Sequence, residues 1–135
     1  MTSTEAPTES TVEAGPDIAG WVRHAVHAAL DRKAVELQLL HLEPVTDFTD
    51  YFLVCSGMNQ RQVQAIADHV QRTLREHKVR PLHVEGERTA QWVLMDYGDF
   101  VVHIFHHDVR DVYALERLWS DAPDVTSKFT PPEPS

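Results

Sequence analysis

The stretch VVHIFHHDVRDVY, residues 101–113, gathers most of the side chains in this chain that could do chemistry. It holds three histidines and two aspartates, which are common metal ligands and common general acids and bases: His103, His106, His107, Asp108 and Asp111. If residues 100–106 form a strand, His103 and His107 lie about 13 Å apart at about 3.3 Å per residue. One zinc ion with bonds of about 2 Å cannot join them. We therefore predict no metal site and no cofactor.

Other potentially reactive side chains stand in patterns that indicate ordinary structural roles. Cys55 ends an apolar run with no histidine beside it in sequence, so we expect a buried thiol. His24 and His27 share a predicted helix that offers no third ligand nearby. No nucleophile elbow, phosphate-binding loop or dinucleotide glycine pattern occurs.

Four aspartates leave an enzymatic alternative open. They flank two predicted turns and could hold Mg²⁺ in a nucleotidyl-transfer site: Asp47, Asp50, Asp96 and Asp99. Aspartate at a turn more often accepts a hydrogen bond from its own backbone, and a loop to cradle phosphates is missing. We therefore expect a protein that is not an enzyme.

Length and composition indicate one globular domain with an acidic surface. The 135 residues carry 24% charged and 42% hydrophobic side chains and a net charge of −9. No apolar run approaches the roughly 20 residues that span a bilayer. The N-terminal segment carries no lysine or arginine, so it fits neither a signal peptide nor a transit peptide. With a single cysteine, these features predict a cytoplasmic protein. The negative charge opposes phosphate binding and favours a basic protein partner, although an RNA-binding module remains an alternative.

The periodicity of apolar residues predicts an α/β fold, a mixed sheet of about five strands with helices packed on it, in the order α-β-β-α-β-β-β-α. The expected elements are a helix over 18–30, strands at 35–42 and 51–55, a helix from Asn59 to 74, strands at 82–84, 91–96 and 100–106, and a helix near 111–120. Residues 1–15 and 122–135 are rich in Pro, Ser, Thr and Glu. They predict a disordered tail and a flexible C-terminal tail around a domain at 16–121.

Side-chain alternation in the strand near residue 92 singles out one face. Trp92, Leu94 and Asp96 share that face, while Val93, Met95 and Tyr97 share the other. The second set is predicted to be core. For Trp92 two interpretations stay open, burial beneath a covering helix or a place at the centre of a binding surface.

Five segments resemble the ribosomal silencing factor family, also called RsfS or Iojap, over roughly residues 18–121. They are T-D-Y-F at 49–52, SGMNQRQV at 56–63, P-x-x-V-E-G at 81–86, WVLMDYGDFVVHIF at 92–105 and R-x-x-Y-x-L-E-R-L-W at 110–119. Each segment alone is weak evidence, but five in this order are specific. The resemblance places His103 in a structural strand and assigns nothing to His106 or His107.

The resemblance implies a nucleotidyltransferase-like fold without enzymatic activity. It implies binding to ribosomal protein fourteen of the large subunit, which sterically blocks subunit joining and represses translation under nutrient limitation or in stationary phase. It implies partner contacts at six positions: Trp92, Leu94, Asp96, Tyr97, Arg110 and Tyr113. We expect no direct DNA partner and no membrane partner, and a homodimer is left open.

Overall fold

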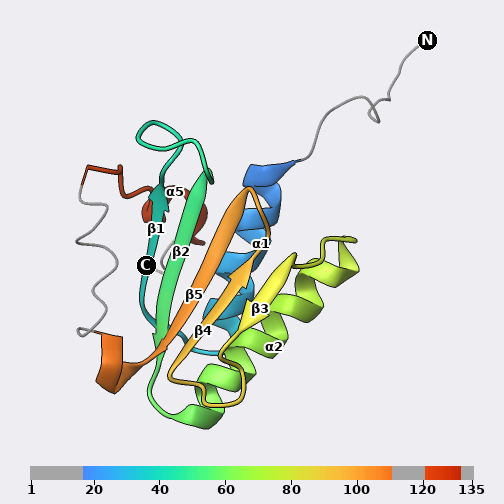
Figure 1. Cartoon of the computed structure of the whole chain (residues 1–135), viewed down its shortest axis with the longest axis vertical. Coiled ribbons are helices and arrows are strands. Elements are labelled where there is room, and N and C mark those ends of the chain that lie inside the picture. The colour runs from blue at the N-terminus through green and yellow to red at the C-terminus, as the bar shows by residue number, and fades with distance from the viewer. Residues whose placement is uncertain (1–16, 111–120, 132–135) are drawn as a thin grey trace.

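The computed structural model describes residues 17–110 and 121–131. A five-stranded sheet runs through them in the order β1-β2-β5-β4-β3, and two helices, α1 and α2, pack beside each other on one face (Figure 1). The elements are α1 (Ile18–Asp31), β1 (Val35–His41), β2 (Tyr51–Gly57), α2 (Gln60–Glu76), β3 (His83–Glu85), β4 (Trp92–Asp96), β5 (Phe100–His106), the 3₁₀ turn η1 (His107–Val109) and α5 (Thr126–Phe129). The predicted α/β fold with a mixed five-stranded sheet is confirmed. The predicted helix near 111–120 and the tail at 1–15 lie outside the described residues.

The sheet is mixed because its two central strands come from distant parts of the chain. β2 and β5 pair in parallel, while β1 with β2, β4 with β5 and β3 with β4 pair antiparallel. A tight turn at Gly98, which has a φ of 87°, connects β4 to β5, as the sequence predicted. Across this turn the Tyr97 amide donates to the Phe100 carbonyl oxygen at 2.9 Å. The hairpin thereby places Trp92 opposite Phe105 and Leu94 opposite His103.

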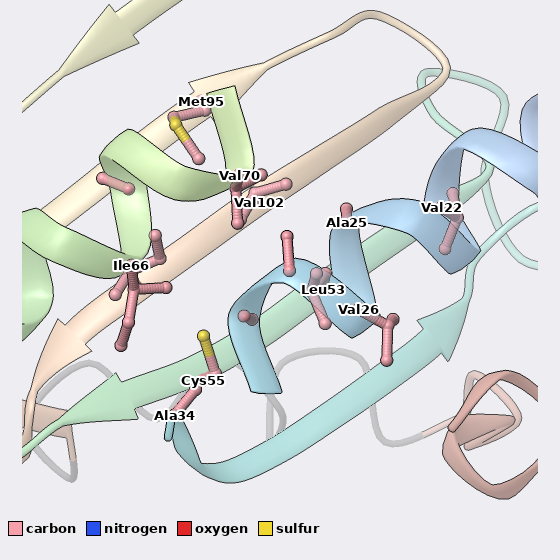
Figure 2. Packing of buried hydrophobic residues seen from close by; sticks show 14 of the residues in the cluster. Val22, Ala25, Val26, Ala34, Leu53, Cys55, Ile66, Val70, Met95 and Val102 are labelled. Carbon is pink, nitrogen blue, oxygen red and sulfur yellow. The ribbon is translucent and has the colours of Figure 1, made fainter. Parts of the chain in front are cut away.

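Capping residues fix where the two long helices begin. The Asp17 side chain accepts a hydrogen bond from the Gly20 amide, and the Asn59 side chain accepts one from the Gln62 amide. The apolar stripes of both helices cover the sheet, and Figure 2 shows Ile66 and Val70 of α2 in the same packed cluster as Met95 and Val102 of the hairpin. Cys55 lies fully buried in the same cluster, as predicted.

The opposite face of the sheet carries a second apolar cluster, which includes residues from β1, β2 and β5. Strand register arranges its side chains in three rows that cross β2, β5 and β4 in turn. The rows are Ser56–Phe105–Trp92, Val54–His103–Leu94 and Phe52–Val101–Asp96. Every residue contributed by β2 and β5 is buried, whereas the three from β4 are only partly buried. Side-chain exposure on this face therefore increases toward β4.

Residues 122–131, which composition assigned to a flexible tail, pack against the domain. Asp124 forms a backbone bridge with Leu40 on β1, and Phe129 is 7% exposed. The Phe129 ring contacts the Tyr51 ring edge-on, and the Arg23 guanidinium lies 4.8 Å from its centroid. These aromatic and cation–π contacts offset the low hydrophobicity of the segment.

Candidate functional site

Trp92 is partly packed and partly exposed on the sheet face opposite α1 and α2. Its ring stacks on Phe105 with centroids 5.3 Å apart and an interplanar angle of 23°. Its indole Nε1–H donates to Nδ1 of His103 at 3.1 Å. Trp92 also lines a small hollow with Leu94, Glu85 and Gly86. The indole is therefore anchored by Phe105 and His103, while Trp92 also borders a depression.

The loop that precedes Trp92 is held in place by α2. Gln64 and Gln71 donate from their amide nitrogens to the carbonyl oxygen and carboxylate of Glu87, at 3.1 and 2.9 Å. Gly86 turns with a φ of 87°, and a Cβ there would lie 2.0 Å from the Trp92 carbonyl oxygen. Only glycine fits this close approach. The loop therefore fixes the entry of β4 and the position of Trp92.

A larger hollow of about 290 Å³ adjoins Trp92 on the same face, and we call it the Leu94 groove. Its lining comprises Phe48, Thr49, Phe52, Leu82, Leu94, Asp96, Gly98, Val101 and His103. Two of its walls are unusually open for large apolar side chains, since Phe48 is 57% exposed and Leu82 76% exposed. An apolar depression framed by exposed apolar side chains is typical of a surface that binds another molecule.

His103 contributes a buried polar group to the lining of the groove. It is 3% exposed, and burial lowers its pKa to about 4, so the ring is neutral at neutral pH. Because the Trp92 indole can only donate, Nδ1 of His103 must accept, and its proton therefore sits on Nε2. Among the described residues this Nε2–H has no hydrogen-bond partner, and neither has the buried Thr49 hydroxyl.

The rim of the groove toward β3 and β4 is acidic. Asp96 accepts a hydrogen bond from the Gly98 amide at 2.7 Å, which fixes one of its oxygens in the hairpin turn. Glu85 lies opposite Leu94 on β3 and is exposed, and its carboxylate contacts the ring of His83. Two carboxylates thus lie beside Trp92 and Leu94, an arrangement that suits a cationic partner.

The six predicted partner residues do not all reach this face. Trp92, Leu94 and Asp96 lie together on it, as alternation predicted. Tyr97 is 8% exposed and belongs to the cluster beneath the helices, where burial raises the pKa of its phenol. Arg110 is 6% exposed, and its guanidinium donates to Ser56 Oγ at 2.9 Å and to the carbonyl oxygen of Glu36. Tyr113 lies outside the described residues.

The carboxylates of the enzymatic alternative are only partly brought together. The Asp50 amide donates to the Asp99 carbonyl oxygen at 2.8 Å, and Asp96 is used in its own turn. Desolvation, together with the negative charges of Glu43 and Asp99, raises the pKa of Asp50. Within residues 17–110 and 121–131, no group of three or more His, Cys, Asp or Glu side chains could hold a metal ion.

The remaining histidines of the opening stretch have separate partners. Nδ1 of His106 accepts a hydrogen bond from the Asp108 amide at 3.1 Å, where β5 passes into η1. Nδ1 of His107 lies 3.5 Å from a carboxylate oxygen of Glu36. The chain turns after His106, and the two rings face different groups.

Sequence reasoning missed three residues of the groove: Phe48, Thr49 and Leu82. Phe48 lies outside every predicted strand, and Leu82, which was predicted to begin a strand at 82–84, comes just before β3. Alternation therefore assigned neither residue to this face. The one signal in the sequence was Leu82 itself, a large apolar residue directly after Pro81.

Comparison with known proteins gives consistent matches. A family model described as "Ribosomal silencing factor during starvation" matches residues 16–135. The chain is 44% identical over 101 residues to ribosomal silencing factor RsfS of Halalkalibacterium halodurans, which covers 75% of this chain and 86% of that protein. It is 43% identical over 99 residues to RsfS of Bacillus subtilis, covering 73% and 84%. A crystal structure of a Chromobacterium violaceum protein matches with a TM-score of 0.75 and 32% identity, covering 89% and 92%.

Within the described residues, no helix has both the length and the hydropathy of a membrane span.

Proposed function

Since this chain belongs to the ribosomal silencing factor family, we propose that it binds the large ribosomal subunit through the sheet face that carries Trp92, Leu94 and Asp96. The contact on the subunit is ribosomal protein fourteen, at the surface that meets the small subunit. A bound domain of this size fills space that the small subunit needs, so joining is blocked sterically and translation is repressed when nutrients are scarce. The protein acts by occupying a surface, without catalysis.

One observation carries this proposal, the apolar groove beside a partly exposed tryptophan with an acidic rim. Tryptophan surrounded by apolar contacts is the side chain most often found at the energetic centre of protein interfaces. The carboxylates of Asp96 and Glu85 and the net charge of −9 favour a basic partner, and ribosomal proteins are typically basic. Arg110 links β1 to β2 from the protein interior through Glu36 and Ser56, and Tyr97 packs on Phe100 beneath the helices.

Co-sedimentation with separated ribosomal subunits tests the proposal. The full chain should migrate with free large subunits in a sucrose gradient and leave small subunits unbound. Added before mixing, it should lower the amount of joined ribosomes in proportion to the large subunits occupied. Equal binding to both subunits, or unchanged joining at saturation, would contradict the steric mechanism.

Two further measurements separate the alternatives. An RNA-binding module would bind ribosomal RNA stripped of protein, with an affinity that falls steeply as salt is raised. A nucleotidyltransferase would bind a nucleoside triphosphate with Mg²⁺ in a calorimeter. We expect neither signal.

A further inference from the structure

We propose that the Leu94 groove accepts one apolar side chain of the partner polypeptide, whose own backbone carbonyl takes the hydrogen bond offered by His103 Nε2–H. A lysine or arginine next to that residue in the partner then lies against Asp96. The inference rests on the proposed function and specifies the recognition element that this face requires.

The apolar part of the inference follows from the groove walls. Phe48 and Leu82 flank the opening at 57% and 76% exposure, and Phe52 and Val101 are buried beneath them. Apolar side chains this exposed lose most contact with water only when another apolar group covers them. Filling the groove therefore supplies a favourable contribution that the free protein lacks.

The polar part follows from two hydrogen-bonding groups that have no partner within residues 17–110 and 121–131. Buried polar groups in folded proteins are nearly always paired, and each exception requires an explanation. Four such side-chain atoms occur among the described residues: Thr49 Oγ1, His69 Nδ1, Tyr97 OH and His103 Nε2. Of these, His103 and Thr49 are both 3% exposed as residues and both line the same groove. A ligand that satisfies them gains specificity, because one lacking an acceptor at this point leaves the donor buried and unpaired.

The acceptor is a neutral carbonyl rather than a carboxylate or phosphate. Asp96 lines the groove, Glu85 lies beside it, and the chain as a whole is acidic, so an anion would enter against like charge. A backbone carbonyl carries no net charge and lies next to its own side chain. One residue of a partner segment can therefore fill the groove and accept from His103. The same electrostatics favour a cationic neighbour at Asp96.

The test compares dissociation constants of full-chain variants for isolated large ribosomal subunits. Phe48→Ala and Leu82→Ala change exposed side chains, so the domain stays folded, and each should weaken binding at least tenfold. Met58→Ala is the matched control, an apolar side chain 51% exposed outside the groove, and it should bind within twofold of wild type. If the groove variants bind as tightly as Met58→Ala, the groove is not the docking site and the inference is overturned.

The polar contacts are tested by a variant that removes no packing. Thr49→Val replaces an unpartnered hydroxyl with a methyl group, so its urea unfolding should match or exceed wild type while its binding weakens at least threefold. A purely structural role would change stability and leave binding alone, which would contradict the inference.

The His103 ring gives a direct reading by nitrogen-15 NMR. In the free protein the spectrum should show the neutral Nε2–H tautomer, and isolated ribosomal protein fourteen should shift this proton downfield and slow its exchange with water. A ring signal unchanged in a saturated complex would overturn the predicted hydrogen bond. Failure of the wild-type chain to bind large subunits is a separate result, which rejects the proposed function and this inference together.

Discussion

Replacing Trp92 with alanine should damage folding and binding by separable amounts. Truncating a fully buried large aromatic residue costs about 3–5 kcal/mol, and Trp92 is only partly buried, so about half of that is expected from lost packing. The change also removes the hydrogen bond to His103 and leaves Nδ1 unpaired at a site 3% exposed, which adds about 1–2 kcal/mol. The expected loss of unfolding free energy is therefore about 2.5–4.5 kcal/mol.

Trp92→Phe separates the two contributions. Phenylalanine can keep an aromatic ring stacked over Phe105 but offers no N–H, so only the hydrogen-bond part, about 1–2 kcal/mol, should be lost. Urea unfolding followed by circular dichroism measures both variants. Identical losses in the two variants would show that the stacking over Phe105 contributes nothing.

Binding is then compared at equal concentrations of folded protein. A tryptophan at the centre of an interface typically contributes at least about 2 kcal/mol, so the affinity of Trp92→Ala for large subunits should fall about 30-fold. Wild-type affinity of the folded fraction would show that this face is not the interface. Wild-type stability of the same variant would refute the packing described for the indole.

Three further predictions follow from neighbouring residues. Burial lowers the pKa of His103 to about 4, so as pH falls below about 6.5 the unfolded chain takes up a proton before the folded chain does. The free energy of unfolding should therefore be about 2 kcal/mol lower at pH 5 than at pH 7, and urea unfolding of His103→Gln should lack this pH dependence. Asp96→Asn keeps an acceptor for the Gly98 amide but loses the charge, so unfolding should change little while binding weakens about two- to fivefold and becomes less sensitive to salt. Gly86→Ala places a Cβ 2.0 Å from a backbone oxygen, at a residue whose φ is positive, and should cost more than about 2 kcal/mol in unfolding free energy. Arg88→Ala, a change at an exposed position in the same loop, should cost almost nothing.

Sequence patterns predict the elements well where the signal is local. Alternation placed Trp92, Leu94 and Asp96 on one face, and the glycine at 98 marked the hairpin turn, because both depend only on neighbouring residues. The same logic located the helix that begins after Asn59. Strand order was out of reach, since the parallel pairing of β2 with β5 joins segments about 50 residues apart in sequence.

The candidate site was harder to predict because its parts come from unrelated segments. Leu82 and Phe48 reach the groove from two loops, and no periodicity relates them to Leu94. Arg110 follows the last strand, and only the folded chain shows that its guanidinium turns inward to Ser56. The local sequence does not specify in which direction a long side chain that follows a strand will point. A residue assigned to a partner surface by family resemblance can therefore have a structural role.

The packing of the C-terminal segment on β1 has a consequence for how copies of this protein behave toward each other. An outer strand with unpaired amides and carbonyls is a template onto which another chain can add a strand. Here the His41 amide donates to the Pro123 carbonyl oxygen, the Val125 amide to the Leu39 carbonyl oxygen, and the Leu39 amide to the Thr126 hydroxyl, so the segment occupies that template from within. The other outer strand, β3, is only three residues long and carries charge. A chain cut before residue 121 would expose the longer edge and should self-associate in sedimentation experiments more than the full chain does. Residues 123–126 therefore protect this edge against strand-to-strand aggregation.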